Sequence, residues 1–195
     1  GGLGGLGGRP SGRGFGVGGV AAQEPHGTRV GQWFFCTFRE VRVLIAPDCF
    51  GGTLTAREAA DAIATGWRDA KPHDVVTERP LADGGPGFVD VLHAALDGDI
   101  RYITVTGPLG EPVEARWLSV SADGRRVAYV ESAEACGLHL IPAELRPESC
   151  ETATTRGVGE LIAAAAADND VITVGLGGSG TTDGGAGMLA ALSDA

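Results

Sequence analysis

Lysine is almost absent from this chain, since only Lys71 among its 15 basic residues is a lysine, and Pro72 follows it directly. The lysine-containing phosphate loop of many nucleotide-binding proteins needs that residue directly after its glycines. This loop is therefore excluded, and bound phosphate would have to be held by backbone amides, arginines and a metal ion. The net charge of −10 also argues against nucleic acid as a partner, because phosphate backbones are bound by clustered Lys and Arg.

Closely spaced cysteines and long apolar runs are also missing. The four cysteines form no Cys-x-x-Cys pair, which excludes the usual zinc and redox motifs and fits a reducing cytoplasm. No stretch approaches the roughly 18 apolar residues that a membrane-spanning helix requires. The glycine-rich beginning does not have the pattern of a signal peptide. We therefore expect a cytoplasmic globular protein without a membrane partner.

Residues 1–40 differ in composition from the rest, because eleven of the first nineteen residues are glycine. Such a segment cannot bury enough apolar surface to offset the entropy of the chain. We expect a disordered leader over residues 1–40 and a folded α/β region over residues 41–195.

The pattern of strand, loop and helix occurs twice at the start of this region. Residues 41–47 form a short apolar run typical of a buried strand, and Thr55 with Glu58 forms a capping box that begins a helix ending at Lys71. Residues 75–79 predict a second strand, and residues 88–96 a second helix with its apolar residues on one face.

Alternating residues in the middle of the chain predict a small antiparallel or mixed sheet. Its strands are residues 100–106, 113–120 and 127–131, and Asp123 with Gly124 predicts the hairpin turn before the last one.

A third unit of strand, loop and helix follows a helix at residues 157–167, which begins at Thr154 or Thr155. Residues 171–176 predict a fully buried strand, and a last helix begins near Ala186. Because the sequence stops within this helix, we expect the fold to be incomplete at its carboxyl end.

Three loops share one design, in which an apolar strand runs into glycines beside an aspartate and then into a helix. In open α/β sheets, ligands bind at the carboxyl ends of the strands, where such loops meet. Aspartates there can hold Mg²⁺ or accept the proton of an attacking hydroxyl. We name them the first glycine loop (residues 48–54), the second glycine loop (residues 83–87) and the third glycine loop (residues 177–185).

The aspartates of these loops, Asp48, Asp83 and Asp183, are the candidate catalytic residues, and Asp48 and Asp183 are the candidate metal ligands. Glycines let the backbone approach an anion, and the amino terminus of a helix offers free N–H groups. The candidate phosphate-binding residues are Gly177, Gly178, Ser179, Gly180, Thr181 and Arg156. The candidate substrate-binding residues are Gly51, Gly52, Gly84 and Gly85. The alternative for each Asp-Gly-Gly is an ordinary turn.

Five segments in this order resemble the two-domain glycerate kinases. The resemblance implies an α/β fold of two domains around a cleft, with flavodoxin-like and restriction-enzyme-like parts, in a protein about twice as long. The segments are IAPDCFGGTLTA (45–56), PLADGGPG (80–87), VTGPLGEPV (105–113), TTRGVGELI (154–162) and GLGGSGTTDGGAGM (175–188).

The sequence departs from the family pattern at four positions: many members have serine at Cys49, lysine at Gly51, glutamate at Pro86 and asparagine at Thr182. Because a lysine in the first glycine loop could bind a carboxylate or phosphate, its absence calls for another cation. We expect Arg156, beside the amino terminus of a helix, to take that role.

The resemblance implies ATP-dependent phosphorylation of glycerate with Mg²⁺ as the metal ion. Glycerate and ATP are then the small-molecule partners, while assembly into a homo-oligomer is left open. Two alternatives remain: a nucleotide-dependent oxidoreductase that uses the glycines of residues 175–180, and a non-catalytic fragment that binds anions. The oxidoreductase would need an acidic residue about 20 positions further on, beyond the end of the sequence.

Overall fold

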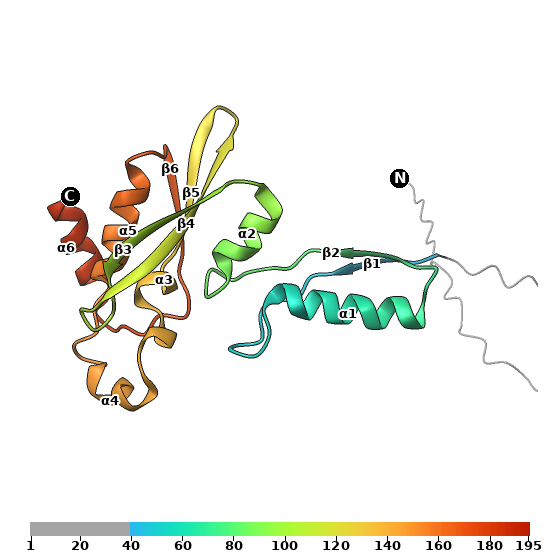
Figure 1. Ribbon diagram of the computed structural model, residues 1–195, viewed down its shortest axis with the longest axis horizontal. Coiled ribbons are helices and arrows are strands. Elements are labelled where there is room, and N and C mark those ends of the chain that lie inside the picture. The colour runs from blue at the N-terminus through green and yellow to red at the C-terminus, as the bar shows by residue number, and fades with distance from the viewer. Residues whose placement is uncertain (1–39) are drawn as a thin grey trace, which may run out of the picture. The chain divides into compact units, whose positions relative to one another are not determined.

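The computed structural model describes residues 40–195, so the leader expected over residues 1–40 lies almost entirely outside the described part. Figure 1 shows the elements of this part. In chain order they are β1 (Arg42–Ile45), α1 (Ala56–Ala70), β2 (Val75–Glu78), α2 (Phe88–Leu96), β3 (Asp99–Thr106), β4 (Pro112–Ala122), β5 (Arg125–Glu131), α3 (Ala133–Cys136), η1 (Leu138–Leu140), η2 (Ala143–Leu145), α4 (Arg146–Ser149), α5 (Arg156–Ala166), β6 (Val171–Gly175) and α6 (Ala186–Asp194).

The strands form two separate sheets. β1 and β2 pair in parallel, with Arg42 opposite Val75 and Ile45 opposite Glu78. The larger sheet has the order β3-β4-β5-β6, in which β3, β4 and β5 are antiparallel neighbours and β6 runs parallel to β5. The mixed sheet expected from the middle of the sequence is therefore confirmed, with β6 as its fourth strand.

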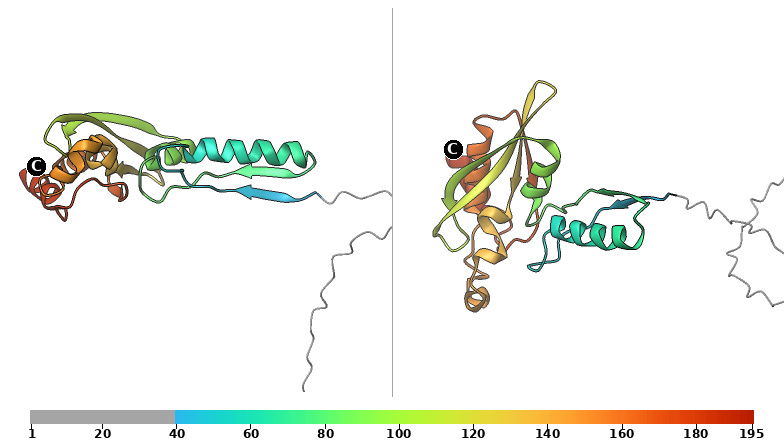
Figure 2. Two further views of the ribbon diagram at one scale, coloured as in Figure 1. Left: turned by 90° about the horizontal axis from the view of Figure 1, so that it is seen from below. Right: turned by 45° about the vertical axis from the view of Figure 1, so that its right-hand side comes forward.

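Helices cover both faces of the four-stranded sheet. Successive side chains of a strand point to opposite faces, so each strand contributes to both contacts. On one face Trp117 and Val130 pack against α5, with Leu161 fully buried among them. On the other face Leu118 packs against α2 through the buried Val89. α6 lies beside α5, and the views in Figure 1 and Figure 2 agree on this arrangement. The sheet is thus the middle layer of three.

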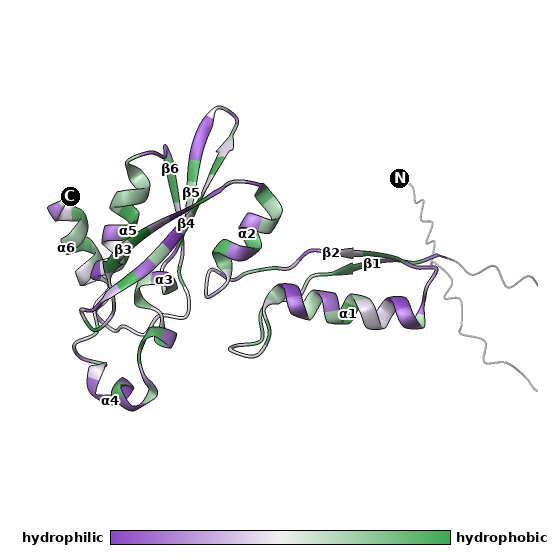
Figure 3. Ribbon diagram, viewed as in Figure 1, coloured by the Kyte–Doolittle hydropathy of each residue, from purple (hydrophilic) through white to green (hydrophobic). Residues whose placement is uncertain are grey.

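α1 packs on the small parallel sheet and begins as the sequence predicts. Ala60 and Ala64 of α1 are fully buried with Ile45 of β1. The Thr55 hydroxyl accepts a hydrogen bond from the N–H of Glu58, and the Glu58 carboxylate accepts one from the N–H of Thr55, which makes both halves of a capping box. Apart from its buried alanines, α1 is largely hydrophilic, as Figure 3 shows.

Two expectations about the elements need correction. β6 is not fully buried: Val171 is 38 % exposed, because β6 is an edge strand of the four-stranded sheet and pairs with β5 alone. The sequence predicts no element between β5 and α5, but this stretch contains the short helices α3, η1, η2 and α4, whose lengths of three or four residues are too short to give a periodic pattern. No helix in residues 40–195 is long and apolar enough to cross a membrane.

Glycines inside two helices allow a test of the packing. A Cβ on Gly157, in α5, would overlap the backbone carbonyl of Thr106, whereas a Cβ on Gly66, in α1, would meet open space. We expect Gly157→Ala to lower the free energy of unfolding by about 1–3 kcal/mol through overpacking. Gly66→Ala should raise it by about 0.5–1 kcal/mol because alanine favours a helix. Urea denaturation measures both, and equal effects would contradict the packing of α5 against β3.

Candidate active site

The second glycine loop lies directly against the end of β6 and the start of the third glycine loop. A Cβ on Gly177 would lie 2.6 Å from Cα of Gly85, and a Cβ on Gly175 would lie 2.7 Å from the carbonyl oxygen of Gly84. These distances are too short for any side chain. The backbones of the two loops therefore touch because glycine occupies both sides of the contact.

The contact does not arise in the way expected from the sequence. The strands before the first and second glycine loops, β1 and β2, form one sheet, whereas β6 before the third belongs to the other. The loops are thus not neighbours at the edge of a single sheet. What brings the second and third loops together is their glycine contact and the residues that support it.

Glu131, the last residue of β5, holds the second glycine loop through hydrogen bonds to its carboxylate. Its side chain is buried, with 3 % exposure of the residue, and its two carboxylate oxygens accept hydrogen bonds of 3.2 and 3.3 Å from the N–H of Gly87. One of these oxygens also accepts a hydrogen bond of 3.2 Å from the N–H of Val89. β5 is thereby joined to the first turn of α2.

Burial raises the pKa of Glu131 to about 7, against the effect of the hydrogen bond from Val89, and the like charge of Glu134 adds to the rise. The ordinary value is 4.5. Between these two values the folded protein binds more protons at Glu131 than the unfolded chain does. The contribution of Glu131 to stability therefore falls as pH rises through this window, and it is constant above and below it.

Arg116 of β4 ties the same region together with charged hydrogen bonds. Its two terminal nitrogens donate to the two oxygens of Asp90 on α2, at 2.8 and 2.9 Å, and its Nε donates to Glu134 on α3 at 2.9 Å. The hydrogen bonds to Asp90 raise the pKa of Arg116 still further above its ordinary value. Such a bidentate pair fixes orientation as well as distance.

The first and second glycine loops lie close enough for their aspartates to interact with the same thiol. Desolvation and the carboxylates of Asp48 and Asp83 raise the pKa of the Cys49 thiol. Asp48 accepts a hydrogen bond from the N–H of Cys49, and Asp83 accepts one from the N–H of Gly85. Each of these aspartates is exposed, so each keeps oxygen atoms accessible from solvent.

A groove of about 1140 Å³ lies beside these two loops. Its lining combines the first glycine loop, the first turns of α1, the end of β2, the second glycine loop and α2. Four of the residues predicted for the site line it: Asp48, Gly51, Gly52 and Gly178. Gly84 and Gly85 are buried behind the groove, in the contact with Gly175 and Gly177.

Asp183 occupies a different place, between the amino ends of α5 and α6. One of its oxygens accepts hydrogen bonds from the N–H and the hydroxyl of Thr155, both at 2.8 Å, and from the N–H of Gly187 at 3.1 Å. The other accepts from the N–H of Gly185 at 3.0 Å. Burial opposes its charge, but the hydrogen bonds prevail and lower the pKa of Asp183. These contacts favour a capping role, in which Asp183 joins two helices.

Several of the predicted phosphate-binding residues have partners within the protein. The N–H of Gly180 donates to the carbonyl of Cys136 at 2.8 Å, and the N–H of Thr181 donates to the Ser179 hydroxyl at 3.3 Å. Arg156 forms ion pairs with Glu160 at 3.1 Å and Asp194 at 3.0 Å. An anion at this loop would have to compete with these contacts.

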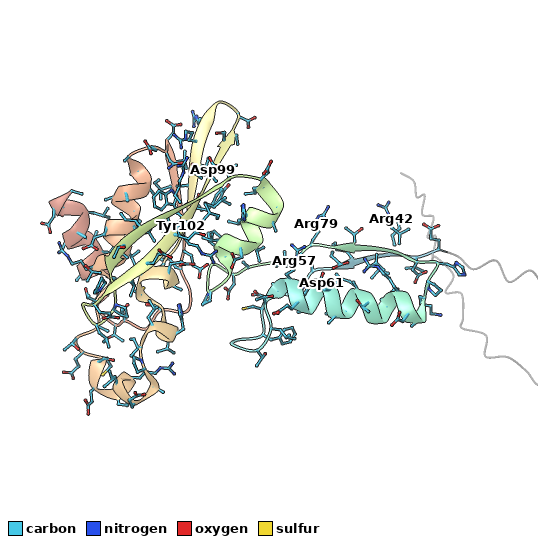
Figure 4. All side chains as sticks on the ribbon, viewed as in Figure 1. Arg42, Arg57, Asp61, Arg79, Asp99 and Tyr102 are labelled. Carbon is cyan, nitrogen blue, oxygen red and sulfur yellow. The ribbon has the colours of Figure 1, made fainter. Side chains whose placement is uncertain are left out.

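Three residues of interest carry no motif that marks them in the sequence. Arg57 and Arg79 line the groove and could supply the positive charge that a lysine at position 51 provides in many family members. Figure 4 labels Arg57 on α1 and Arg79 directly after β2. Arg79 donates a hydrogen bond to the carbonyl of Glu78. For Glu131 the alternation of β5 offers a signal, because it puts Glu131 on the same face as Tyr129, which packs against the buried cluster under α2.

The accessible carboxylates of the first two glycine loops fit Mg²⁺ better than a cation that needs many protein ligands. No group of three or more His, Cys, Asp and Glu residues within residues 40–195 is arranged to hold a metal ion. Mg²⁺ is usually held by one or two carboxylates together with water and substrate phosphates. Asp48 lines the groove, and Asp83 is exposed in the second glycine loop without being part of the groove lining. The oxygens of Asp183 already accept four hydrogen bonds.

Comparison with known proteins assigns the fold to a family. The profile of the glycerate kinase family matches residues 43–194, which contain all three glycine loops. The chain belongs to the glycerate kinase family. This confirms the resemblance carried by the five sequence motifs.

Two curated relatives and one solved structure describe the match. An uncharacterized protein of Mycobacterium bovis is 52 % identical over 153 residues, and the glycerate 2-kinase of Escherichia coli is 46 % identical over 153 residues. Each match covers 78 % of this chain and 39 % of the relative, so the chain spans well under half the length of these two relatives. A crystal structure described as glycerate kinase 2 of Salmonella typhimurium has a TM-score of 0.62 at 42 % identity, over 79 % of this chain and 40 % of that one.

The capping role of Asp183 predicts a loss of stability when its charge is removed. In Asp183→Asn an amide N–H₂ would face backbone donors, so we expect the free energy of unfolding in urea at neutral pH to fall by about 1–3 kcal/mol. Because the pKa of Asp183 is lowered in the fold, the difference should shrink as pH falls below 3.8, its ordinary value.

Asp123→Asn is the matched control, since Asp123 lies in the hairpin turn at φ 51°, which asparagine tolerates well. Its stability should stay within about 0.5 kcal/mol of the original. Equal stability of Asp183→Asn and the original protein would show that the four hydrogen bonds do not hold the helix ends.

Proposed function

We propose that the protein transfers the γ-phosphoryl group of ATP to the 2-hydroxyl of glycerate. The observation that carries the proposal is the family match over residues 43–194, together with the 46 % identity to a glycerate 2-kinase. The groove supports it, because Asp48 and the backbone of Gly51, Gly52 and Gly178 line it, and Asp83 is exposed in the second glycine loop, which borders it. The family's two-domain architecture, with flavodoxin-like and restriction-enzyme-like parts, belongs to the same proposal.

Phosphoryl transfer depends mainly on positioning and on charge stabilisation, so each part of the groove has a defined task. We assign to Asp48 or Asp83 the acceptance of the proton from the attacking hydroxyl, since both carboxylates are accessible. Arg57 is the cation for the carboxylate of glycerate, and it lies in the first turn after the capped start of α1.

Mg²⁺ would be held by whichever of Asp48 and Asp83 does not act as the base, together with phosphate oxygens of ATP. When bound it neutralises the charge that develops on the transferring phosphoryl group. The backbone of Gly51, Gly52 and Gly178 lines the groove without side chains, which leaves room for close approach of an anion. Among residues 40–195 these glycines line the groove directly, whereas Gly84 and Gly85 maintain its shape from behind.

The family match favours neither alternative. A nucleotide-dependent oxidoreductase would bind a pyrophosphate at the third glycine loop, but the N–H groups of Gly180 and Thr181 already donate within the protein. A non-catalytic anion-binding protein would have no need for an accessible aspartate in the groove lining, which Asp48 provides.

The proposal predicts glycerate kinase activity that depends on Asp48. Because the chain spans 39 % of the Escherichia coli relative, we would assay it joined to the part of that relative which the match does not cover. With ATP, Mg²⁺ and D-glycerate we expect 2-phosphoglycerate, and we expect Asp48→Asn to lower kcat by about 10²–10⁴-fold.

The control is Asp123→Asn in the same joined protein, which makes the same chemical change in a hairpin turn away from the groove and should leave kcat unchanged. Absence of phosphoglycerate from a folded joined protein would overturn the proposed activity. Unchanged turnover in Asp48→Asn would overturn the role of Asp48.

A further inference from the structure

We propose that Glu131 is a positioning residue for the groove, in that its carboxylate holds the second glycine loop and the start of α2 where the ligand needs them. The inference concerns a residue that neither the motifs nor the proposed mechanism uses. It rests on the proposed function in one respect, which is that glycerate is taken as the ligand of the groove.

The start of α2 needs an acceptor that its own sequence does not provide. The residue that begins the helix is Gly87, in the left-handed conformation at φ 95°, and no side chain caps the helix there. The first N–H groups of a helix have no partner within it and are normally satisfied by a side chain at this position. Glu131 accepts the hydrogen bonds of Gly87 and Val89 instead, from more than 40 residues further along the chain.

Glu131 acts on residues that themselves reach the groove. The N–H of Gly87 donates to both carboxylate oxygens of Glu131, and Gly87 lines the groove, as do Pro86 before it and Asp90 one turn later. On its other side the loop is fixed by the contact of Gly85 with Gly177. The second glycine loop is thus held by two contacts. Of these two, the contact with Glu131 depends on the charge of a side chain.

The charged groups around Glu131 come from three elements. Glu134 on α3 repels its charge, and Arg116 on β4 attracts it while donating to Asp90 on α2 and to Glu134. A protonated carboxyl has an O–H donor in place of one acceptor, so it holds the two N–H groups less well. Deprotonation therefore tightens the loop, although the buried charge lowers the stability of the fold. We expect glycerate to bind more strongly as the pH rises through neutrality.

The first test follows the backbone amide resonances of Gly87 and Val89 by NMR while the pH of a solution of the protein is raised. Both resonances should titrate together near the pKa of Glu131, which is about 7. In Glu131→Gln this inflection should vanish. In Glu134→Gln it should move to lower pH, because a like charge beside Glu131 has been removed. Glu114→Gln, an exposed position on β4, should leave it unchanged.

The second test measures the affinity for D-glycerate at pH values on both sides of neutrality. Glu131→Gln should weaken binding about tenfold at alkaline pH and should abolish its pH dependence, while Glu114→Gln should bind as the original does. A purely structural role would lower the melting temperature of Glu131→Gln and leave the affinity of the folded protein unchanged, which would overturn the inference.

The two tests separate this inference from the proposed function. If the original protein does not bind glycerate, the proposed substrate fails, while the amide titration still decides whether Glu131 holds the loop. If Glu131→Gln does not fold, the titration of the original protein and of Glu134→Gln remains decisive. Amides of Gly87 and Val89 that do not respond to pH near neutrality would overturn the role of Glu131.

Discussion

The groove depends on one constraint, which is that two stretches of backbone from different sheets approach too closely for any side chain. A Cβ on Gly177 would lie 2.6 Å from Cα of Gly85, so both loops must be free of side chains at this point. The contact fixes where the second glycine loop can be. The loops of the small parallel sheet and of the four-stranded sheet can then contribute to one site although no strand ladder joins the sheets.

Two charged residues stabilise this close approach from the side of the four-stranded sheet. Glu131 satisfies the first N–H groups of α2, and Arg116 holds the same helix through both oxygens of Asp90. Burying the charge of Glu131 is unfavourable, and the raised pKa of Glu131 reflects this. A buried carboxylate at the base of a glycine loop is therefore explained by the geometry it imposes on the loop rather than by a gain in stability.

Much of the fold could be predicted from the sequence, because its signals are local. The capping box at Thr55 begins α1 as predicted, and α2 has the predicted limits. The features that could not be predicted depend on contacts between distant residues. Glu131 meets α2 across more than 40 positions, and Asp183 meets Thr155 across 28. An aspartate beside glycines looks the same in sequence whether it faces a groove, as Asp48 does, or joins two helices, as Asp183 does.

The most direct test of the account is whether the second and third glycine loops touch in solution. Nuclear Overhauser effects between the Hα protons of Gly85 and Gly177 measure this contact. We predict that they are strong in the original chain and lost in Gly177→Ala, whose Cβ would collide with Gly85, while Gly66→Ala retains them. Absence of these effects from the folded original chain, or their persistence in Gly177→Ala, would contradict the claim that the groove is built on this contact.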